Sequence, residues 1–468
     1  MTHYDVIVIG SGPAGQKAAI KCATVGRKVA VIDDREVVGG RCLHIGTIPS
    51  KTLRAAIIYL SGYYERKLYG EQYRVKQEIT VEDLLFRATA IIRREIEVIQ
   101  GQLRAIGVDV YNGRATFADP HSLSVVASSG VTQLSGDYII ICTGSASKVQ
   151  VKLPFDGVRV MNTDDIMSLK YLPAKLMIIG GSVIGMEYAS MFALLDMEVL
   201  LVSPYEKLLP FVDHQLIEAL TAFMTRHGVK FYMCDDVAEI KIAGPRRVTG
   251  KLKSGTPFDV GQVLYAAPRW GNTAELNLAA AGLAPLVKGY LKVNQVYQTD
   301  VPHIYAAGDV IGFPSLASTS IDQGRKAANH LLGVKDVPYA PIFPYGIYTF
   351  PDMSMVGASE EQLKLEGQPY EVGIGRYYES ARGQIIGDED GLVKLLFDPR
   401  DRKLLGVHII GSEATELIHI GQSVLIHGGL IDFFLDTVFN YPTLAEVYKI
   451  AAFNGFSKLP ASLPAEHL

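Results

Sequence analysis

The stretch YDVIVIGSGPAGQKAAIKCATVGRKVAVID, residues 4–33, decides the fold. A short apolar run ends in the glycine-rich turn Gly10–Gly15, and an alanine-rich segment with helical spacing follows it. A second apolar run, Lys28–Ile32, then ends at Asp33. This order of strand, glycine turn, helix, strand and acid predicts a βαβ unit.

Each glycine of this turn has a separate role in binding a dinucleotide. Gly10 permits the tight turn, Gly12 lets the backbone approach a pyrophosphate, and Gly15 lets the helix pack closely on the strand. Asp33 follows Gly15 by 18 residues, close to the spacing of about 20 at which an acid accepts hydrogen bonds from a ribose. The neighbouring residues Pro13, Ala14 and Asp34 complete this first predicted nucleotide site.

A near copy of the pattern begins at Lys175. A strand over Leu176–Ile179 leads to glycines 180, 181 and 185, a helix follows to about Leu195, and a second strand covers Glu198–Val202. Two such units in one chain predict an α/β protein with two Rossmann-like domains that bind two nucleotides at once.

The second fingerprint departs from the pattern at two positions. Ser182 stands where the second glycine belongs, and Ser203 stands where an NAD-specific site has an acid. An acid there repels a 2′-phosphate, whereas the uncharged Ser203 with Lys207 nearby favours the use of both NAD(H) and NADP(H). Glu206 argues against a strongly phosphate-selective pocket, and a plain NAD preference is the alternative. The second predicted site comprises Gly180, Ser182, Val183, Ile184, Gly185, Glu187 and Ser203.

Length and composition limit the class of protein. With 468 residues and about 150 residues per domain, roughly three domains are expected. A hydrophobic content of 48% excludes wholesale disorder, and a net charge of −4 gives no basic surface for nucleic acid. The four cysteines form neither a disulfide framework nor a metal-ligand pattern, so no metal is predicted. We expect a cytoplasmic protein without a signal peptide or membrane span, and we interpret the apolar stretch Leu176–Leu195 as a buried strand and helix.

Hydrophobic spacing predicts the remaining elements. Helices are expected over Ser50–Tyr69 and Thr80–Ile106, and β-structure over Val108–Gln150. From Phe343 the pattern changes to short strands, which are followed by two helices and a frayed tail: Ile347–Phe350, Val372–Tyr377, Leu392–Phe397, Lys403–Ile410, Ala414–His427, Thr443–Asn454 and Pro460–Leu468.

Two further strand ends add to the first nucleotide site. The run Ile139–Gly144 ends in a tight turn that contains Thr143 and Gly144, and the run Ile304–Asp309 ends on the acid Asp309. Together with the first fingerprint, these segments resemble the set that holds FAD in flavoproteins with two dinucleotide folds.

The segment GGRCLHIGTIPSK, residues 39–51, looks like the active-site helix of the pyridine nucleotide–disulfide oxidoreductases, such as dihydrolipoyl dehydrogenase and glutathione reductase. The segment PYGIYTFPDMSMVG, residues 344–357, is similar to the start of that family's dimerisation domain. The resemblance covers nearly the whole chain and implies a homodimer or higher homo-oligomer. It implies an FAD-binding domain over residues 1–150 and 273–342, an NAD(P)-binding domain over 151–272, and an α+β dimerisation domain over 343–468.

Two departures from this family both remove groups that are needed to reduce a disulfide. Disulfide-reducing members have a second cysteine five residues after the first, where this chain has Thr47. They also have a histidine before a Pro-Thr pair, where this chain has Tyr441. A threonine forms no disulfide, and a phenol with a pKa near 10 is a poor base at neutral pH. This combination resembles the soluble, Si-specific NAD(P)+ transhydrogenases, and it implies ping-pong hydride transfer between NADPH and NAD+ through FAD.

The resemblance also implies roles for individual residues. Gly40, Arg41, Cys42 and Thr47 lie beside the flavin, Lys51 lies near its N5 atom, and Glu187 pairs with Lys51 beside the nicotinamide. Tyr441 of a partner subunit is expected to fill the former disulfide-substrate pocket and to limit access to the flavin. Cys42 is expected to be chemically silent, with a peroxidatic cysteine as the alternative, and His44 is expected to be a packed, hydrogen-bonded histidine.

Two other functions remain open from the sequence. The absence of the second cysteine and of the histidine is also compatible with an NAD(P)H oxidase, a quinone reductase or a diaphorase, because each of these enzymes uses an acceptor other than a disulfide. A catalytically retired flavoprotein that serves as a binding or scaffold subunit is the alternative from another class. The intact FAD motifs, Lys51 and Glu187 argue against a scaffold.

Overall fold

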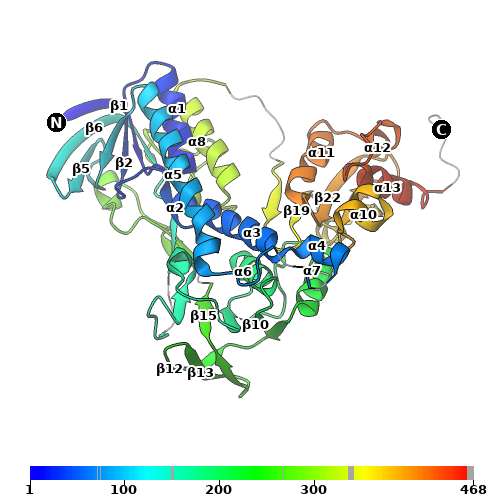
Figure 1. The fold of residues 1–468 in the computed structure, drawn as a ribbon. Coiled ribbons are helices and arrows are strands. Elements are labelled where there is room, and N and C mark those ends of the chain that lie inside the picture. Colours follow the sequence, from blue (N-terminus) through cyan, green and yellow to red (C-terminus); the bar gives the residue numbers. More distant parts are fainter. Residues whose placement is uncertain (71, 74, 149–151, 267, 336–341, 461–468) are drawn as a thin grey trace.

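The computed structural model describes residues 1–70, 72–73, 75–148, 152–266, 268–335 and 342–460. Three sheets of five or more strands organise this part of the chain, and helices pack against each of them (Figure 1). The predicted α/β fold class, with two Rossmann-like sheets and an α+β C-terminal part, is confirmed. Apart from Pro460, the predicted frayed tail lies outside the described residues.

The first sheet begins with the quoted fingerprint. Strands β3, β2, β1 and β6 are parallel, β17 adds to β6, and β5 and β4 continue the sheet antiparallel. Its strands are β1 (Thr2–Ile9), β2 (Val29–Asp33), β3 (Asp109–Asn112), β4 (Arg114–Asp119), β5 (Ser122–Ala127), β6 (Gly130–Ile141) and β17 (Ile304–Ala306). The associated helices are α1 (Pro13–Thr24), α2 (Gly40–His44), α3 (Thr47–Ser61), α4 (Tyr63–Tyr69), α5 (Val81–Ala105) and α8 (Ala317–Leu331), with the short helices η2 (Leu278–Ala281), η3 (Val287–Gly289) and η4 (Asp309–Ile311).

Strand β1 is buried on both faces, which explains its continuous apolar sequence. Val6 and Val8 pack under α1 and α8, which lie side by side in Figure 1. Ile7 and Ile9 point to the opposite face, where β4 and β5 cover them. Side chains thus alternate between the two faces. Because β1 ends at Ile9 and lies between β2 and β6, the glycine turn that follows it stands at the carboxyl end of a central strand.

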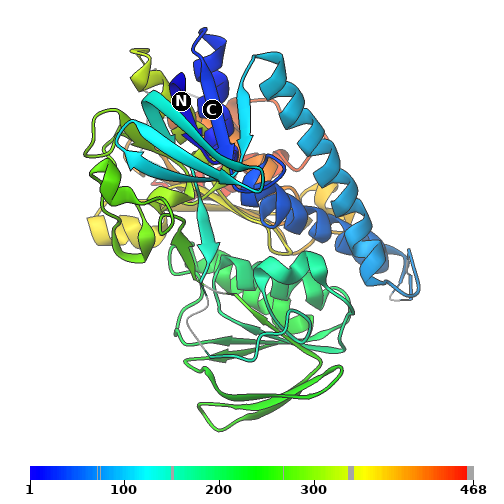
Figure 2. The same ribbon diagram turned by 90° about the vertical axis from the view of Figure 1, so that its left-hand side faces the viewer.

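The second sheet is entirely parallel, in the order β11-β10-β9-β15-β8. A separate antiparallel layer, β12-β13-β14, covers one of its faces and lies at the far end of the molecule from the N-terminus (Figure 2). The paired strands β7 and β16 lie in the two chain segments that connect the first sheet with the second. The elements are β7 (Ser145–Ser147), β8 (Val160–Asn162), η1 (Thr163–Ser168), β9 (Lys175–Ile179), α6 (Val183–Ala193), β10 (Glu198–Ser203), α7 (His214–Arg226), β11 (Val229–Met233), β12 (Val237–Gly244), β13 (Arg247–Leu252), β14 (Pro257–Val260), β15 (Gln262–Tyr265) and β16 (Arg269–Gly271).

The C-terminal sheet is antiparallel, in the order β18-β19-β22-β21-β20, and helices α11 and α13 pack on it. Its elements are β18 (Tyr345–Ile347), β19 (Met353–Gly357), α9 (Glu360–Glu366), β20 (Glu371–Arg376), η5 (Tyr377–Glu379), α10 (Ala381–Ile386), β21 (Leu392–Phe397), β22 (Leu404–Ile410), α11 (Ala414–Ile426), α12 (Asp432–Asp436) and α13 (Glu446–Phe456).

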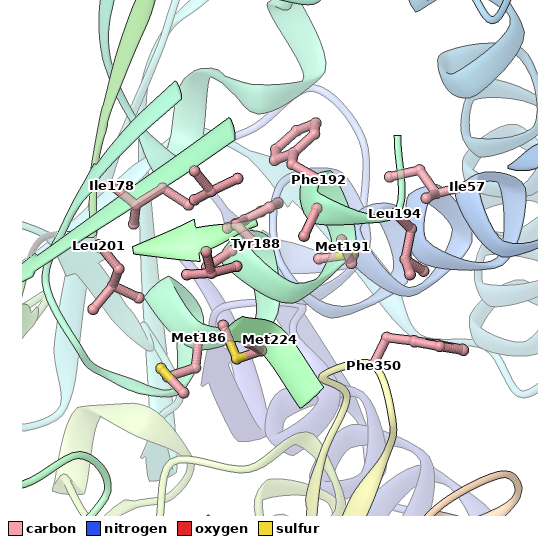
Figure 3. Packing of buried hydrophobic residues seen from close by; sticks show 14 of the residues in the cluster. Ile57, Ile178, Met186, Tyr188, Met191, Phe192, Leu194, Leu201, Met224 and Phe350 are labelled. Carbon is pink, nitrogen blue, oxygen red and sulfur yellow. The ribbon is translucent and has the colours of Figure 1, made fainter. Parts of the chain in front are cut away.

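One apolar cluster joins all three parts of the fold (Figure 3). It contains Ile57 of α3, Phe192 of α6, Met224 of α7 and Phe350 from the loop between β18 and β19. Helix α6 is buried from Gly185 to Ala193 and, apart from Glu187 and Ser190, is built of apolar or aromatic residues, as expected for a helix that is surrounded by protein. The packing therefore fixes α3 and α6 against each other, and both helices carry predicted site residues.

One predicted helix is divided in the structure. The helix expected over Ser50–Tyr69 is interrupted at Gly62, which has a φ of +63° and separates α3 from α4. The apolar stretch Leu176–Leu195 forms the buried elements β9 and α6, as predicted. Within the described ranges, no helix is both long and apolar enough to cross a membrane.

Candidate functional site

A cavity of about 1550 Å³ opens at the carboxyl ends of the parallel strands, where α/β proteins bind their ligands. Both glycine fingerprints and part of the C-terminal domain line this one cavity. The predicted site residues that line it are Gly10, Gly12, Pro13, Ala14, Asp33, Asp34, Gly40, Arg41, Cys42, Thr47, Lys51, Thr143, Gly144, Ser182, Val183, Ile184, Glu187 and Asp309. The predicted residues Gly15, Gly180, Gly185, Ser203 and Tyr441 are not part of its wall.

Gly15 and Gly185 do not line the cavity, but they allow close packing of the helices next to it. A Cβ atom on Gly15 would lie 1.9 Å from the carbonyl oxygen of Gly10, and one on Gly185 would lie 1.9 Å from that of Gly180. Only glycine permits helix and strand to approach so closely, which is the packing role predicted for the third glycine of each fingerprint.

Three helices direct unsatisfied N-termini at the cavity. Helices α1, α3 and α8 begin after Gly12, Gly46 and Leu316, and none of these residues caps the helix with its side chain. Free backbone N–H groups and the positive end of the helix dipole suit an anion such as a pyrophosphate.

The Asp33 carboxylate stabilises the first glycine turn by hydrogen bonds. It accepts hydrogen bonds from the Ser11 backbone N–H at 2.7 Å, from the Ser11 hydroxyl at 2.5 Å and from the Arg35 N–H at 3.0 Å. A carboxylate has about four acceptor positions, so one is left for a ligand hydroxyl. The exposed Asp34 lies next to it on the cavity wall.

Buried polar atoms without partners support a bound polar ligand. The Thr143 hydroxyl, the Arg41 Nε and the Trp270 Nε1 are buried and have no hydrogen-bond partner within the described part of the chain. All three residues line the cavity. Because native proteins satisfy nearly all buried polar atoms, these atoms, all of which can donate a hydrogen bond, fit a ligand with several acceptors, such as FAD or NAD(P).

Lys51 and Glu187 form an ion pair on the cavity wall. The Lys51 Nζ lies 2.6 Å from Glu187 Oε2, and the side chains are 25% and 7% exposed. The other carboxylate oxygen of Glu187 accepts a hydrogen bond of 2.9 Å from the Tyr348 backbone N–H. The Lys51 Nζ also lies 4.7 Å from the centre of the Tyr348 ring. The predicted pair thus joins α3 to α6, and the loop after β18 adds a hydrogen bond to it.

Cys42 lies on the cavity wall in surroundings that favour its thiol form. Burial raises the pKa of Cys42, and the hydrogen bond with Thr47 offsets this only in part. All four cysteines are free. The His44 Nε2 lies 3.0 Å from the carbonyl oxygen of Val38, which makes His44 a packed, hydrogen-bonded residue.

The loop after β10 differs from the expected arrangement. Ser203 is 1% exposed, and its hydroxyl accepts a hydrogen bond from the Tyr205 N–H at 3.3 Å. Tyr205, Glu206 and Lys207 line the cavity in its place. Tyr441 is 71% exposed and lies outside the cavity of its own subunit.

The structure adds residues that the sequence did not assign to the site. Asp164 pairs with Arg41, and Arg269 donates to the Ser145 hydroxyl at 2.9 Å. The Lys148 Nζ lies 3.7 Å from the centre of the Trp270 ring. These residues lie beside the two connecting strands, and no local motif marks them because their placement depends on the pairing of β7 with β16.

Comparisons with known proteins agree with this architecture. Residues 4–324 match the pyridine nucleotide-disulphide oxidoreductase family, and residues 343–452 match that family's dimerisation domain. The soluble pyridine nucleotide transhydrogenase of Mycobacterium tuberculosis is 46% identical over 98% of this chain and 99% of its own length. The protein of the same name from Colwellia psychrerythraea is 40% identical over 97% of this chain and 98% of its own length.

Solved structures share the fold. The flavoprotein disulfide reductase RclA of Escherichia coli superposes with a TM-score of 0.85 at 26% identity, covering 96% of this chain and 99% of RclA. LpdA of Mycobacterium tuberculosis superposes with a TM-score of 0.88 at 24% identity, covering 97% and 99% of the two chains. This chain belongs to the pyridine nucleotide-disulphide oxidoreductase family.

Proposed function

We propose that this protein is an FAD-containing transhydrogenase that moves a hydride between NADPH and NAD+ in a ping-pong cycle. One observation carries the proposal: a single cavity is lined by both dinucleotide fingerprints and by the ion pair of Lys51 and Glu187. Thr47, which stands where a disulfide would need its second cysteine, supports it. The full-length similarity to proteins named soluble pyridine nucleotide transhydrogenase supports the same activity.

The residues of the first sheet fit FAD. The glycine turn and the N-terminus of α1 would hold its pyrophosphate, and Asp33 with Asp34 would accept hydrogen bonds from its ribose. The unpartnered hydroxyl of Thr143, together with Gly144, Asp309, Gly40, Arg41, Cys42 and Thr47, would line the rest of the FAD site. When bound, the flavin supplies the group that accepts and returns the hydride.

The residues of the second sheet fit the nicotinamide dinucleotide. Ser182 and the N-terminus of α6, with Val183 and Ile184, would contact its pyrophosphate. We assign residues 1–150 and 273–342 to the FAD-binding domain, 151–272 to the NAD(P)-binding domain and 343–468 to the dimerisation domain. The pattern of the sheets supports these boundaries.

The ion pair of Lys51 and Glu187 would position the two rings. Its location between α3 and α6 places one fixed cation and one fixed anion where the two nucleotide sites meet. Preorganised charges of this kind stabilise charge that moves during transfer without a cost for reorganisation. The hydrogen bond from Tyr348 keeps the carboxylate in place.

The family's dimerisation domain supports a homodimer or a higher homo-oligomer. In such an assembly the exposed Tyr441 of one subunit would cover the cavity of the other and limit access to the flavin. We also propose that the enzyme works in the cytoplasm, and the relatives named soluble support this location.

The experiment is an anaerobic assay of hydride transfer from NADPH to thio-NAD+ by the purified yellow holoenzyme. Fast transfer is expected, with no activity when dihydrolipoamide and NAD+ are supplied as the control pair. Flavin that NADPH reduces but thio-NAD+ does not reoxidise would contradict the proposal. Oxygen uptake or quinone reduction with NADPH alone would then identify an oxidase, quinone reductase or diaphorase. A preparation without bound flavin would favour a scaffold.

A further inference from the structure

A second, smaller cavity of about 280 Å³ lies where α4, the end of α7 and the loop after α10 meet (Figure 1). Within the described part of the chain, it shares no lining residue with the nucleotide cavity. All three parts of the fold contribute to it, because α4 follows α3, α7 precedes β11 of the second sheet, and the loop leads into β21 of the C-terminal sheet. Its lining residues are Tyr63, Arg66, Lys67, Arg226, His227 and Asp390.

Cations outnumber carboxylates on the wall of this second cavity. The Asp390 carboxylate is shared by two of them, at 3.2 Å from the Lys67 Nζ and at 2.7 Å from the Arg226 guanidinium. The third cation, Arg66, lies 3.2 Å from Asp196, which is largely exposed and does not line the cavity. Among the described residues, the wall thus carries three cations and one carboxylate. A cleft with such an excess of one charge attracts a ligand of the opposite charge, here an anion.

Two hydrogen-bond donors of the wall are buried without a use. Tyr63 is 9% exposed, and its hydroxyl has no hydrogen-bond partner among the residues that the structure describes. The Arg66 Nε is buried and also lacks a partner there. Burial and the negative charge of Asp390 raise the pKa of Tyr63, so its hydroxyl keeps its proton and remains a donor at neutral pH. Buried donors are rarely left unsatisfied, so both fit a ligand that offers acceptor oxygens.

His227 forms a fixed side of the cavity. Its Nδ1 lies 2.8 Å from the carbonyl oxygen of Phe223, and its ring stacks on the Phe223 ring with 4.1 Å between the centres. A carbonyl oxygen only accepts, so Nδ1 carries a proton and donates it. The other nitrogen, Nε2, accepts a hydrogen bond when the ring is neutral and donates one when it is protonated, so it suits a ligand oxygen of either kind.

We propose that this cavity is a second ligand site, which binds a phosphate group that is accompanied by an O–H donor. Lys67, Arg226 and Arg66 bind the anionic oxygens, and the Tyr63 hydroxyl adds a neutral hydrogen bond. Asp390 is the one group of the described wall that can only accept, so it takes the O–H of the ligand. Inorganic phosphate carries such an O–H itself at neutral pH, and a polyol phosphate carries one on a neighbouring carbon. Sulfate has a similar shape and charge but no O–H, so Asp390 disfavours it.

The size and the position of the cavity agree with a small ligand that holds the parts of the fold together. A volume of about 280 Å³ lies just below the range of about 300–1,000 Å³ that is usual for drug-sized ligands, so a whole dinucleotide does not fit. A phosphate that contacts α4, α7 and the loop after α10 binds only the folded arrangement of these segments. Its binding should therefore raise the melting temperature of the protein by mass action.

The test is a calorimetric titration of the holoenzyme in Tris–chloride buffer with inorganic phosphate, glycerol 3-phosphate and sulfate. The wild type is expected to bind one of the two phosphates at least about tenfold more tightly than sulfate. Arg226→Gln and Lys67→Gln should each weaken phosphate binding about tenfold, and Tyr63→Phe should weaken it about threefold. Asp390→Asn should bind sulfate about as tightly as phosphate, because an amide also donates to an oxygen that carries no proton.

Arg247→Gln is the matched control. Arg247 forms an exposed pair with Asp259 at 2.7 Å, the same distance as in the pair of Arg226 with Asp390, but it lines neither cavity. It should leave the phosphate affinity unchanged. The melting temperature of each variant without ligand shows whether it is folded, and only a folded variant should fail to gain stability when phosphate is added.

Several results would overturn the proposal. These are no saturable binding of either phosphate, equal affinity for sulfate in the wild type, full affinity in both Arg226→Gln and Lys67→Gln, or the same loss in Arg247→Gln. Tighter binding of inorganic phosphate than of glycerol 3-phosphate would identify free phosphate as the ligand, and the reverse order would identify a polyol phosphate. The outcome is independent of the proposed hydride transfer, because no residue of this wall lines the nucleotide cavity within the described ranges.

Discussion

Lys51 and Glu187 are 136 residues apart in the chain, yet their side chains meet at 2.6 Å in the wall of the cavity. Lys51 extends from α3 beside the first sheet, and Glu187 extends from the buried helix α6 of the second. The Tyr348 N–H from the C-terminal domain completes the cluster. A single carboxylate therefore connects the three parts of the fold at the point where two nucleotides would meet.

Removing the charge of Glu187 tests this relationship. In Glu187→Gln the amide can still accept the Tyr348 hydrogen bond, but Lys51 loses its counter-ion. We expect the rate of flavin reduction by NADPH to fall about tenfold to a hundredfold, with a smaller change in the NADPH concentration at half-saturation. Anaerobic stopped-flow absorbance measures both quantities. Glu218→Gln, at an exposed position on α7, is the control, and an equal rate in both variants would exclude a role for the pair.

A buried cation joins the second sheet to the C-terminal sheet. Lys394 is 1% exposed and contacts Asp213 at 2.9 Å and also Glu360. Lys394→Met leaves two carboxylates without this partner, so we expect a loss of about 3–5 kcal/mol in the free energy of unfolding. Urea unfolding of the holoenzyme measures this loss. Lys364→Met removes an exposed partner of Glu360 and should have little effect, so a similar loss in both variants would contradict this explanation.

Asp352 should make stability depend on pH in an unusual direction. Burial raises the pKa of Asp352 to about 6, although its partner Arg54 lowers it. Between its unfolded pKa near 4 and pH 6, the folded protein binds a proton that the unfolded chain has released. The contribution of Asp352 to stability is thus complete below pH 4 and falls by up to about 1.4 kcal/mol per pH unit as the pH rises to 6.

Unfolding curves of wild type and Asp352→Asn across this pH range isolate the effect. The difference in unfolding free energy between the two proteins should change steadily from pH 4 to pH 6 and be constant above pH 7. A difference that is constant over the whole range would show that folding does not raise the pKa of Asp352.

Tyr441 is expected to act in the partner's cavity, since it is exposed on its own subunit. Tyr441→His should raise the rate at which oxygen reoxidises the reduced flavin, because a smaller, more polar side chain covers the pocket less well. Oxygen uptake after reduction by NADPH measures that rate. Tyr378→His, another exposed tyrosine of the C-terminal domain, should not change it. If oxygen reoxidises the flavin of Tyr441→His at the wild-type rate, Tyr441 does not limit access to the flavin.

The fold could be predicted largely because its signals are local. The glycine turns at Gly10 and Gly180 and the apolar strands before them specify two βαβ units within short windows. The strands β6 and β17 pair although more than 150 residues separate them, and the sequence indicated only that both strands end at the first nucleotide site. The layer β12–β14 was missed because its strands are half-exposed and weakly periodic.

The site was predicted less completely than the fold. The family resemblance implied the pair of Lys51 and Glu187, but the third member of their cluster is the backbone N–H of Tyr348, which no side-chain motif can reveal. The sequence also placed Ser203 in the nucleotide site, because the end of the strand was taken as the contact point. Its hydroxyl turns inward to Tyr205, and the loop beyond it lines the cavity. Such local turns depend on tertiary packing.

The most direct test of the central claim is a single-turnover experiment without oxygen. The holoenzyme is reduced with one equivalent of NADPH, NADP+ is removed by gel filtration, and the reduced protein is mixed with thio-NAD+. The account predicts one thio-NADH per bound FAD, together with the return of the yellow absorbance. Reduced protein that stays bleached in the presence of thio-NAD+ would contradict it.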